Sequence, residues 1–271
     1  MTAAPVTTPD DRTLPALQNA GVMALPFIAA VSSPRLVLQT VFADPRVPED
    51  FRIATLSLPD IVLIGLLAVT VFRFITDPPY RTHLGATLRG IFTHWGGIAL
   101  LLLAGWMVAG TLWAGEPVLA RVGTAHYAVA LAAMVIVADR MREGGASVLG
   151  GALTGLLAGA LIHAGIAILQ VLNQNPLGLS WLGEVRRFVY DPTTFYRAPG
   201  LSMHPNFLGG YLMLALFGCA LWTVSRLRLS PDKVVSAVIP PVLVGAVCVL
   251  GLLATASRGA MLATVIGAIP L

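Results

Sequence analysis

The chain has 271 residues, of which 56% are hydrophobic and only 11% carry a formal charge, and its net charge is +4. A soluble domain usually carries about 25% charged residues, so this composition favours a polytopic helical membrane protein over a soluble one. The basic residues lie in loops, where they indicate membrane orientation, and nucleic-acid binding is not expected.

Apolar segments follow one another along the whole chain. Because about 20 apolar residues cross a bilayer, we predict an all-α fold, a transmembrane bundle of about seven complete spans plus a truncated eighth. The complete spans are expected near residues 17–33, 58–76, 92–113, 118–138, 147–172, 206–224 and 235–254. The eighth begins near residue 258. Residues 1–16 form an N-terminal tail, and residues 17–271 form the bundle, with a long loop at about 173–205.

Lys and Arg in the loops predict the orientation. One side of the membrane receives residues 1–16, 73–91, 139–146 and 225–234. Among the short loops, 139–146 and 225–234 carry five basic residues, whereas 114–121 and 255–258 carry two, so the N-terminus is placed in the cytoplasm. Loop 173–205 and the turn at 255–258 are separated by two spans. They therefore emerge on the same face in either orientation.

Two spans begin on that face with an Arg near the helix start. Asn206 is expected to be the N-cap of one, with Arg197 nine residues earlier. Ser257 is expected to be the N-cap of the other, with Arg258 in its first turn. A helix N-terminus favours an anion and Arg binds phosphate in bidentate fashion, so the pair predicts a diphosphate site. The alternative is that each Arg snorkels to lipid headgroups and that His204 only caps or packs.

The sequence around these helix starts resembles a known family. The stretch RAPGLSMHPNFLGGYL resembles the Arg-x-x-Gly, Asn and small-residue pattern that precedes a span in the O-antigen ligase and O-antigen polymerase family. LLATASRGAML resembles the Ser-Arg-Gly signature of that family, and TLSLPDIVLIGLLAVTVF is similar to its early span. The three matches keep the family's order and cover most of the chain.

The resemblance implies a multi-pass enzyme of the bacterial inner membrane, with loop 173–205 in the periplasm. Such enzymes move a glycan from undecaprenyl diphosphate to an acceptor glycan, lipid A-core or a protein, and they use no nucleotide sugar, cofactor or metal. Carried onto this sequence, the arginines that hold the diphosphate are Arg197 and Arg258. Asn206 and Ser257 complete the expected binding set.

The family also carries a periplasmic loop beyond the Ser-Arg-Gly span, with a His that is proposed to activate the acceptor hydroxyl. This sequence stops at VIGAIPL. The resemblance therefore implies a general base beyond residue 271, no catalytic residue is assigned within the chain, and we expect the chain alone to lack ligase activity.

Further polar residues are candidates for a glycan path. They are His204, Arg186, Arg187, Gln170, Asn173 and Arg121. Amides suit sugar hydroxyls, but a solvated helix end explains Gln170 and Asn173 equally well. Interfacial packing is the alternative for Arg186 and Arg187.

The fifth span carries a stripe of small residues that ends in a histidine. Gly151, Gly155, Gly159 and His163 recur every four residues, which lets another helix approach closely. His163 is expected to face the bundle interior, either as a structural hydrogen-bonding group or as a proton relay. A secondary transporter or flippase for an anionic lipid-linked substrate would account for such a His, although no internal repeat is evident. A non-catalytic membrane scaffold is the third possibility.

Overall fold

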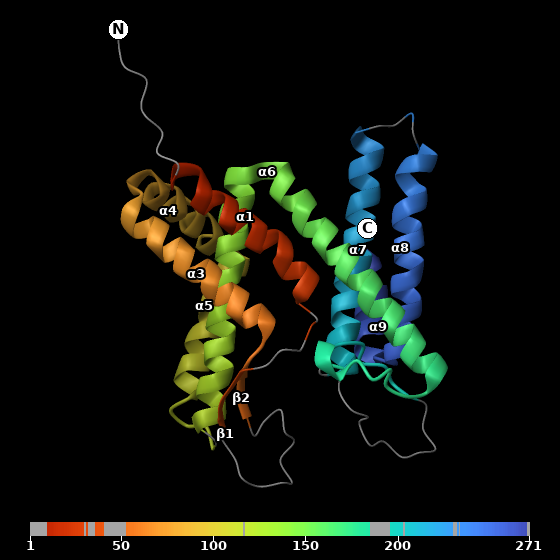
Figure 1. Cartoon of the computed structure of the whole chain (residues 1–271). Coiled ribbons are helices and arrows are strands. Elements are labelled where there is room, and N and C mark those ends of the chain that lie inside the picture. Colours follow the sequence, from red (N-terminus) through yellow and green to blue (C-terminus); the bar gives the residue numbers. More distant parts are fainter. Residues whose placement is uncertain are drawn as a thin grey trace. The chain divides into compact units, whose positions relative to one another are not determined.

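The computed structural model describes residues 10–29, 31, 36–40, 53–115, 117–184, 196–202, 204–229, 232 and 234–269. In these residues the regular secondary structure is helical apart from β1 (Leu36–Thr40) and β2 (Ile53–Leu56), which pair antiparallel between the predicted spans 17–33 and 58–76 (Figure 1). The chain divides into two compact units. Unit 1 holds Met1–Met23, Leu36–Leu56 and Asp60–Gly150, and unit 2 holds Ala24–Arg35, Ser57–Pro59 and Gly151–Leu271.

The helices are α1 (Asp10–Ile28), α3 (Leu58–Thr76), α4 (Pro78–Phe92), α5 (Trp95–Gly110), α6 (Pro117–Asn173), α7 (Pro205–Leu229), α8 (Val234–Thr255) and α9 (Arg258–Ala268), with a short 3-10 turn, η1 (Ser180–Leu182). By length and composition, α3, α7, α8 and the part of α6 from Ala120 could each cross a membrane. The bent pair of α4 and α5 gives a fifth crossing if it counts as one span. A helical fold with several helices apolar enough to cross a membrane is thus confirmed, while the predicted number of about seven spans is not.

Two predicted boundaries on the N-terminal side are wrong. α1 begins at Asp10, so part of the predicted tail 1–16 is helical. Residues 73–91, predicted as a loop, contain α4. Asp77 caps α4 by accepting a hydrogen bond from the Tyr80 N–H at 3.2 Å, and two prolines occupy its first turn, where no N–H is needed. The double proline therefore starts a helix instead of breaking one.

The long helix α6 is interrupted at one glycine. Its 57 residues would rise about 85 Å as one helix, far more than the hydrocarbon core of about 30 Å. Gly145, at φ 56° and ψ −140°, breaks the helical path. The break falls inside the predicted loop 139–146, between the predicted spans 118–138 and 147–172.

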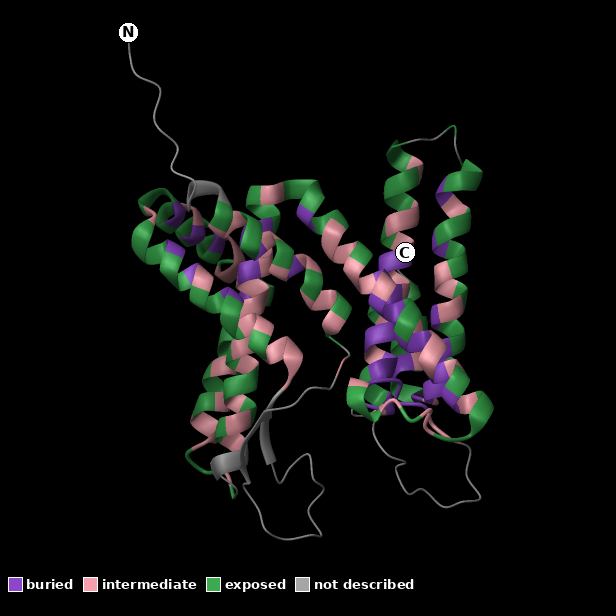
Figure 2. Ribbon diagram, in the orientation of Figure 1, coloured by how far each residue is buried: buried purple, intermediate pink, exposed green. Residues whose placement is uncertain are grey.

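The core of unit 2 lies where the second half of α6, the first half of α7, the second half of α8 and α9 meet, and buried residues gather there in Figure 2. Small residues allow this packing, since a Cβ on Gly251 of α8 would lie 2.6 Å from the Cβ of Ala164 on α6. Cys219 and Cys248 are free and buried in this core, where they act as small hydrophobic residues.

The predicted stripe on α6 also serves close packing. Gly159 is buried, and a Cβ there would collide with the Tyr211 hydroxyl of α7 and with the backbone of Phe27. The Tyr211 hydroxyl donates to the Pro26 carbonyl oxygen at 2.6 Å. Gly159 is therefore the point at which α7 and the end of α1 come nearest to α6.

Candidate functional site

Arg197 connects the start of α7 to the end of α8 in unit 2. Its Nη2 donates to Oδ1 of Asn206, in the first turn of α7, at 2.8 Å. Its Nε donates at 3.2 Å to the carbonyl oxygen of Thr255, the last residue of α8. The Ala198 N–H donates to the Ala254 carbonyl oxygen at 3.1 Å. The loop before α7 is thereby fixed to the end of α8, directly before α9.

The starts of α7 and α9 are packed against each other. A Cβ on Gly209 of α7 would lie 2.9 Å from the Cβ of Ser257, the N-cap residue of α9. Ser257 has extended backbone angles, is buried and makes no capping bond with its side chain. Arg258 stands in the first turn with its side chain exposed. The predicted N-cap position of Ser257 and the first-turn position of Arg258 are therefore confirmed.

The predicted N-cap of α7 is wrong by two residues. The helix begins at Pro205, and the His204 carbonyl oxygen accepts from the Phe207 N–H at 3.0 Å. The Asn206 N–H donates to Nδ1 of His204 at 3.1 Å, so the imidazole performs the capping. Since His204 and not Asn206 caps the helix, the side-chain amide oxygen of Asn206 is not used for capping. It accepts from Arg197 instead. His204 thus has the capping role that was its simpler alternative.

Gly200 is the glycine of the Arg-x-x-Gly pattern, and two steric reasons favour glycine at this position. Its φ is 62°, a left-handed conformation that side chains disfavour. A Cβ there would also lie 2.9 Å from Cδ2 of Leu208. The buried Gln170 holds this residue from α6, because its Oε1 accepts from the Gly200 N–H at 2.9 Å and its Nε2 donates to the Gly200 carbonyl oxygen at 3.0 Å.

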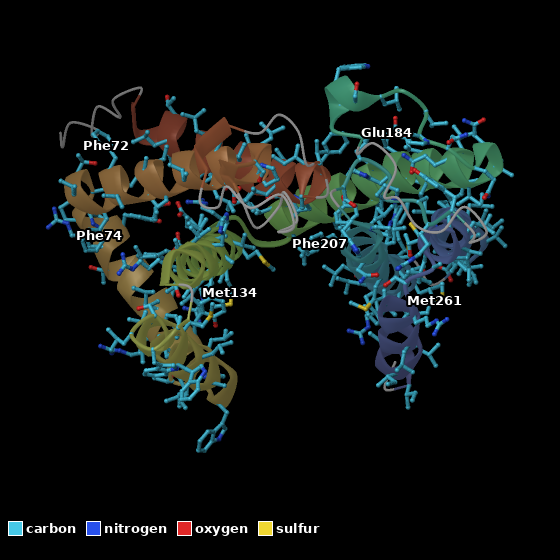
Figure 3. All side chains as sticks on the ribbon, turned by 90° about the horizontal axis from the view of Figure 1, so that it is seen from below. Phe72, Phe74, Met134, Glu184, Phe207 and Met261 are labelled. Carbon is cyan, nitrogen blue, oxygen red and sulfur yellow. The ribbon has the colours of Figure 1, made fainter. Side chains whose placement is uncertain are left out.

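Glu184, labelled in Figure 3, was missed in the sequence and anchors the first part of the same loop. Its carboxylate accepts from Nε2 of Gln170 at 2.6 Å and from the backbone N–H groups of Leu177 and Leu179, each at 2.5 Å. The side chain is buried. Both polar atoms of the Gln170 amide are therefore used inside the protein, which identifies Gln170 as a residue that holds the loop. The signal in the sequence was a carboxylate in a loop that follows an amide-rich helix end.

The other candidates for a glycan path lie in different parts of the chain. Asn173 is exposed at the end of α6. Arg121 is exposed on the part of α6 that belongs to unit 1. Arg186 and Arg187 lie outside the described residues.

His163 faces the interior of unit 2, as predicted, with 1% of its surface exposed. Its ring meets that of Tyr211 edge to face, with 5.7 Å between the centroids. Within the described part of the chain, its Nδ1 has no hydrogen-bond partner. One of the two predicted roles of His163 was a structural hydrogen bond. The described residues show no such bond from Nδ1.

Unit 1 contains a network of buried charged residues. Its arginines were expected to lie in loops. Arg73 and Arg140 are 6% and 2% exposed. Both donate to Oε1 of Gln18, at 2.6 and 3.3 Å, and Arg140 also donates to Glu143 at 2.5 Å. These arginines were counted as free loop charges, but their pairing with Gln18 and Glu143 explains why they can be buried.

One part of this network could hold a metal ion. Ligand atoms of His83, Asp139 and Glu143 lie within 4.8 Å of one another. Asp139 is fully buried and accepts from the hydroxyls of Tyr80 and Thr87, at 2.9 and 3.3 Å. The bond from Arg140 already neutralises Glu143, however, so this carboxylate is paired without a metal ion.

Comparisons with protein-family models, with curated proteins and with solved structures found no match. The chemistry of the residues themselves is therefore the basis for a function. In unit 2 the starts of α7 and α9 pack against each other, the half-buried Arg197 bonds the start of α7 and the end of α8, and Arg258 is exposed in the first turn of α9. This is an arrangement suited to an anion with more than one charge.

Proposed function

We propose that the protein is a membrane glycosyltransferase, a ligase or polymerase of the O-antigen type, acting at the periplasmic face of the bacterial inner membrane. It would move a glycan from undecaprenyl diphosphate to an acceptor glycan, lipid A-core or a protein. One observation carries the proposal: Arg197 bonds both the start of α7 and the residue that ends α8, three positions before Arg258.

The diphosphate would lie between the two arginines. Arg has five N–H donors, and the bonds to Asn206 and Thr255 use only part of those on Arg197. Charge-assisted hydrogen bonds contribute about 1.5–3 kcal/mol each. The first-turn N–H groups of α9 add a partial positive charge on the side of Arg258. An Arg is unfavourable next to this partial positive charge, and a bound diphosphate would compensate for both.

Glycan transfer needs a binding site for the diphosphate, because undecaprenyl diphosphate is the leaving group. The acceptor hydroxyl attacks the anomeric carbon, and its oxygen forms the new glycosidic bond. The bond from that carbon to the phosphate oxygen breaks, and the electron pair stays on undecaprenyl diphosphate. The hydroxyl proton passes to a base. Arg197 and Arg258 would stabilise the negative charge that grows on the departing diphosphate.

The proposed topology keeps the predicted orientation and the full set of spans. The bent pair of α4 and α5 would cross once, and Gly145 would divide α6 into two crossings. With α1, α3, α7 and α8 this gives the predicted seven, and α9 begins the eighth. The N-terminus would lie in the cytoplasm, and Arg197 and Arg258 would face the periplasm.

A secondary transporter or flippase for an anionic lipid-linked substrate is the second candidate. His163 favours it, because an imidazole nitrogen inside the bundle has no hydrogen-bond partner among the described residues. Intramembrane ionisable residues often mark proton relays. A transporter would need His163 for its cycle, whereas the proposed transferase would tolerate His163→Gln.

The test is complementation in a deletion strain of the source bacterium. Loss of long-chain surface glycan should be restored by the wild-type gene and not by Arg258→Ala. Arg228→Ala is the matched control, because Arg228 is also exposed in unit 2 but lies in the last turn of α7. Full restoration by Arg258→Ala, at equal protein level in the membrane, would refute the diphosphate role.

A further inference from the structure

Helix α5 has exposed tryptophans at both ends. Trp95, its first residue, is 87% exposed, and Trp106 and Trp113 near the other end are 67% and 61% exposed. The last two rings pack edge to face, 5.7 Å apart. The 16 residues of α5 rise about 24 Å, and the turn that carries Trp113 adds to this length. Since Trp concentrates at membrane interfaces, this helix matches one crossing of the hydrocarbon core.

Helix α4 meets α5 at 90°, so it lies along the membrane surface when α5 crosses it. Its buried face is made of Tyr80, Leu84 and Thr87. Arg81 and Arg89 are exposed on the same helix. Basic side chains on a helix that lies in the interface favour contact with anionic headgroups.

An apolar groove of about 450 Å³ runs beside α4 in unit 1. It is lined by α3, α4, α5 and the first half of α6, through residues that include Phe74 (labelled in Figure 3), Leu88, Phe92 and Ala132. Its volume lies within the range of about 300–1,000 Å³ that is typical of ligand sites. α3 is itself a membrane-spanning candidate, and when it crosses the membrane this groove is surrounded by lipid chains.

We propose that this groove binds one acyl chain of an anionic phospholipid, with the lipid phosphate held by Arg81 and Arg89. Arg81 donates to the carbonyl oxygens of Phe74 and Ile75, at 2.6 and 2.5 Å, which fixes its guanidinium at the end of α3 beside a groove residue. Arg89 follows Leu88, another groove residue. Both charges thus stand on α4, one of the four helices that line the groove. The inference depends on membrane insertion of unit 1 and is independent of glycan transfer.

The experiment is native mass spectrometry of the full chain, released from nanodiscs that contain equal amounts of phosphatidylglycerol and phosphatidylcholine with identical acyl chains. The wild type should retain phosphatidylglycerol preferentially. Arg89→Gln should reduce that retention about fivefold, the effect of one basic residue near an anionic surface. Arg121→Gln is the control: Arg121 is also exposed in unit 1, but it lies near the start of α6 and not on α4.

The groove is tested by filling it and by changing its lining. Ala132→Phe should reduce the retention of both lipids, and Leu88→Gln should do the same without adding volume to the core. Equal retention of the two lipids by the wild type would overturn the headgroup assignment. Unchanged retention by both groove variants, with helical content equal to that of the wild type, would overturn the acyl-chain site.

Discussion

Replacement of Gly200 by alanine tests how the site is built. The residue has φ 62°, and in the left-handed region a side chain costs about 1–2 kcal/mol. The new methyl group would also stand 2.9 Å from Cδ2 of Leu208. Overpacking costs about 1–3 kcal/mol, and the end of a leucine can shift, so the low end applies. We expect Gly200→Ala to destabilise the folded state by about 2–3 kcal/mol.

The assay is thermal unfolding in detergent, followed by circular dichroism, together with limited proteolysis of loop 173–205. Gly210→Ala is the matched control. Gly210 lies in α7 with no atom within 4 Å of a Cβ placed there, so its replacement should stabilise the helix by up to about 1 kcal/mol. Equal melting temperatures and equal cleavage rates for the two variants would show that Gly200 is not required by its conformation.

Three further changes test other contacts of unit 2. Gln170→Leu leaves the buried N–H and carbonyl of Gly200 without partners, at about 1–3 kcal/mol each, so loop 173–205 should be cleaved faster; an unchanged rate would contradict its anchoring role. Ala256→Gly should raise the melting temperature, because Ala256 has φ 48°, and no increase would contradict strain there. Gly251→Val should lower the melting temperature, since its Cβ would lie 2.6 Å from that of Ala164; wild-type stability would contradict this packing.

The sequence predicted the site to the extent that local rules determine it. Ser257 and Arg258 were placed correctly because a polar residue before an apolar run marks a helix start. Asn206 was placed wrongly because Asn is the better N-cap by propensity, whereas the imidazole of His204 takes that role in the structure. The bridge from Arg197 joins residues far apart in the sequence, and no local rule predicts it.

The charged network of unit 1 shows a second limit of sequence reasoning. Arg73 and Arg140 were treated as topological signals because basic residues near span ends usually face water. Their burial depends on Gln18, Glu143 and other groups from distant helices, which satisfy the guanidinium groups. The position of the kink in α6 was predicted, as a loop between two spans, because Gly145 lies among polar residues between two apolar runs.

Binding of a polyprenyl diphosphate to the full chain in nanodiscs tests the central claim most directly. Loss of one charge-assisted hydrogen bond costs about 1.5–3 kcal/mol, so Arg258→Ala should weaken the affinity by roughly 10-fold to 150-fold. Arg228→Ala should leave the affinity unchanged. Equal affinities of the wild type and Arg258→Ala, or no measurable binding to either, would contradict the proposed diphosphate site.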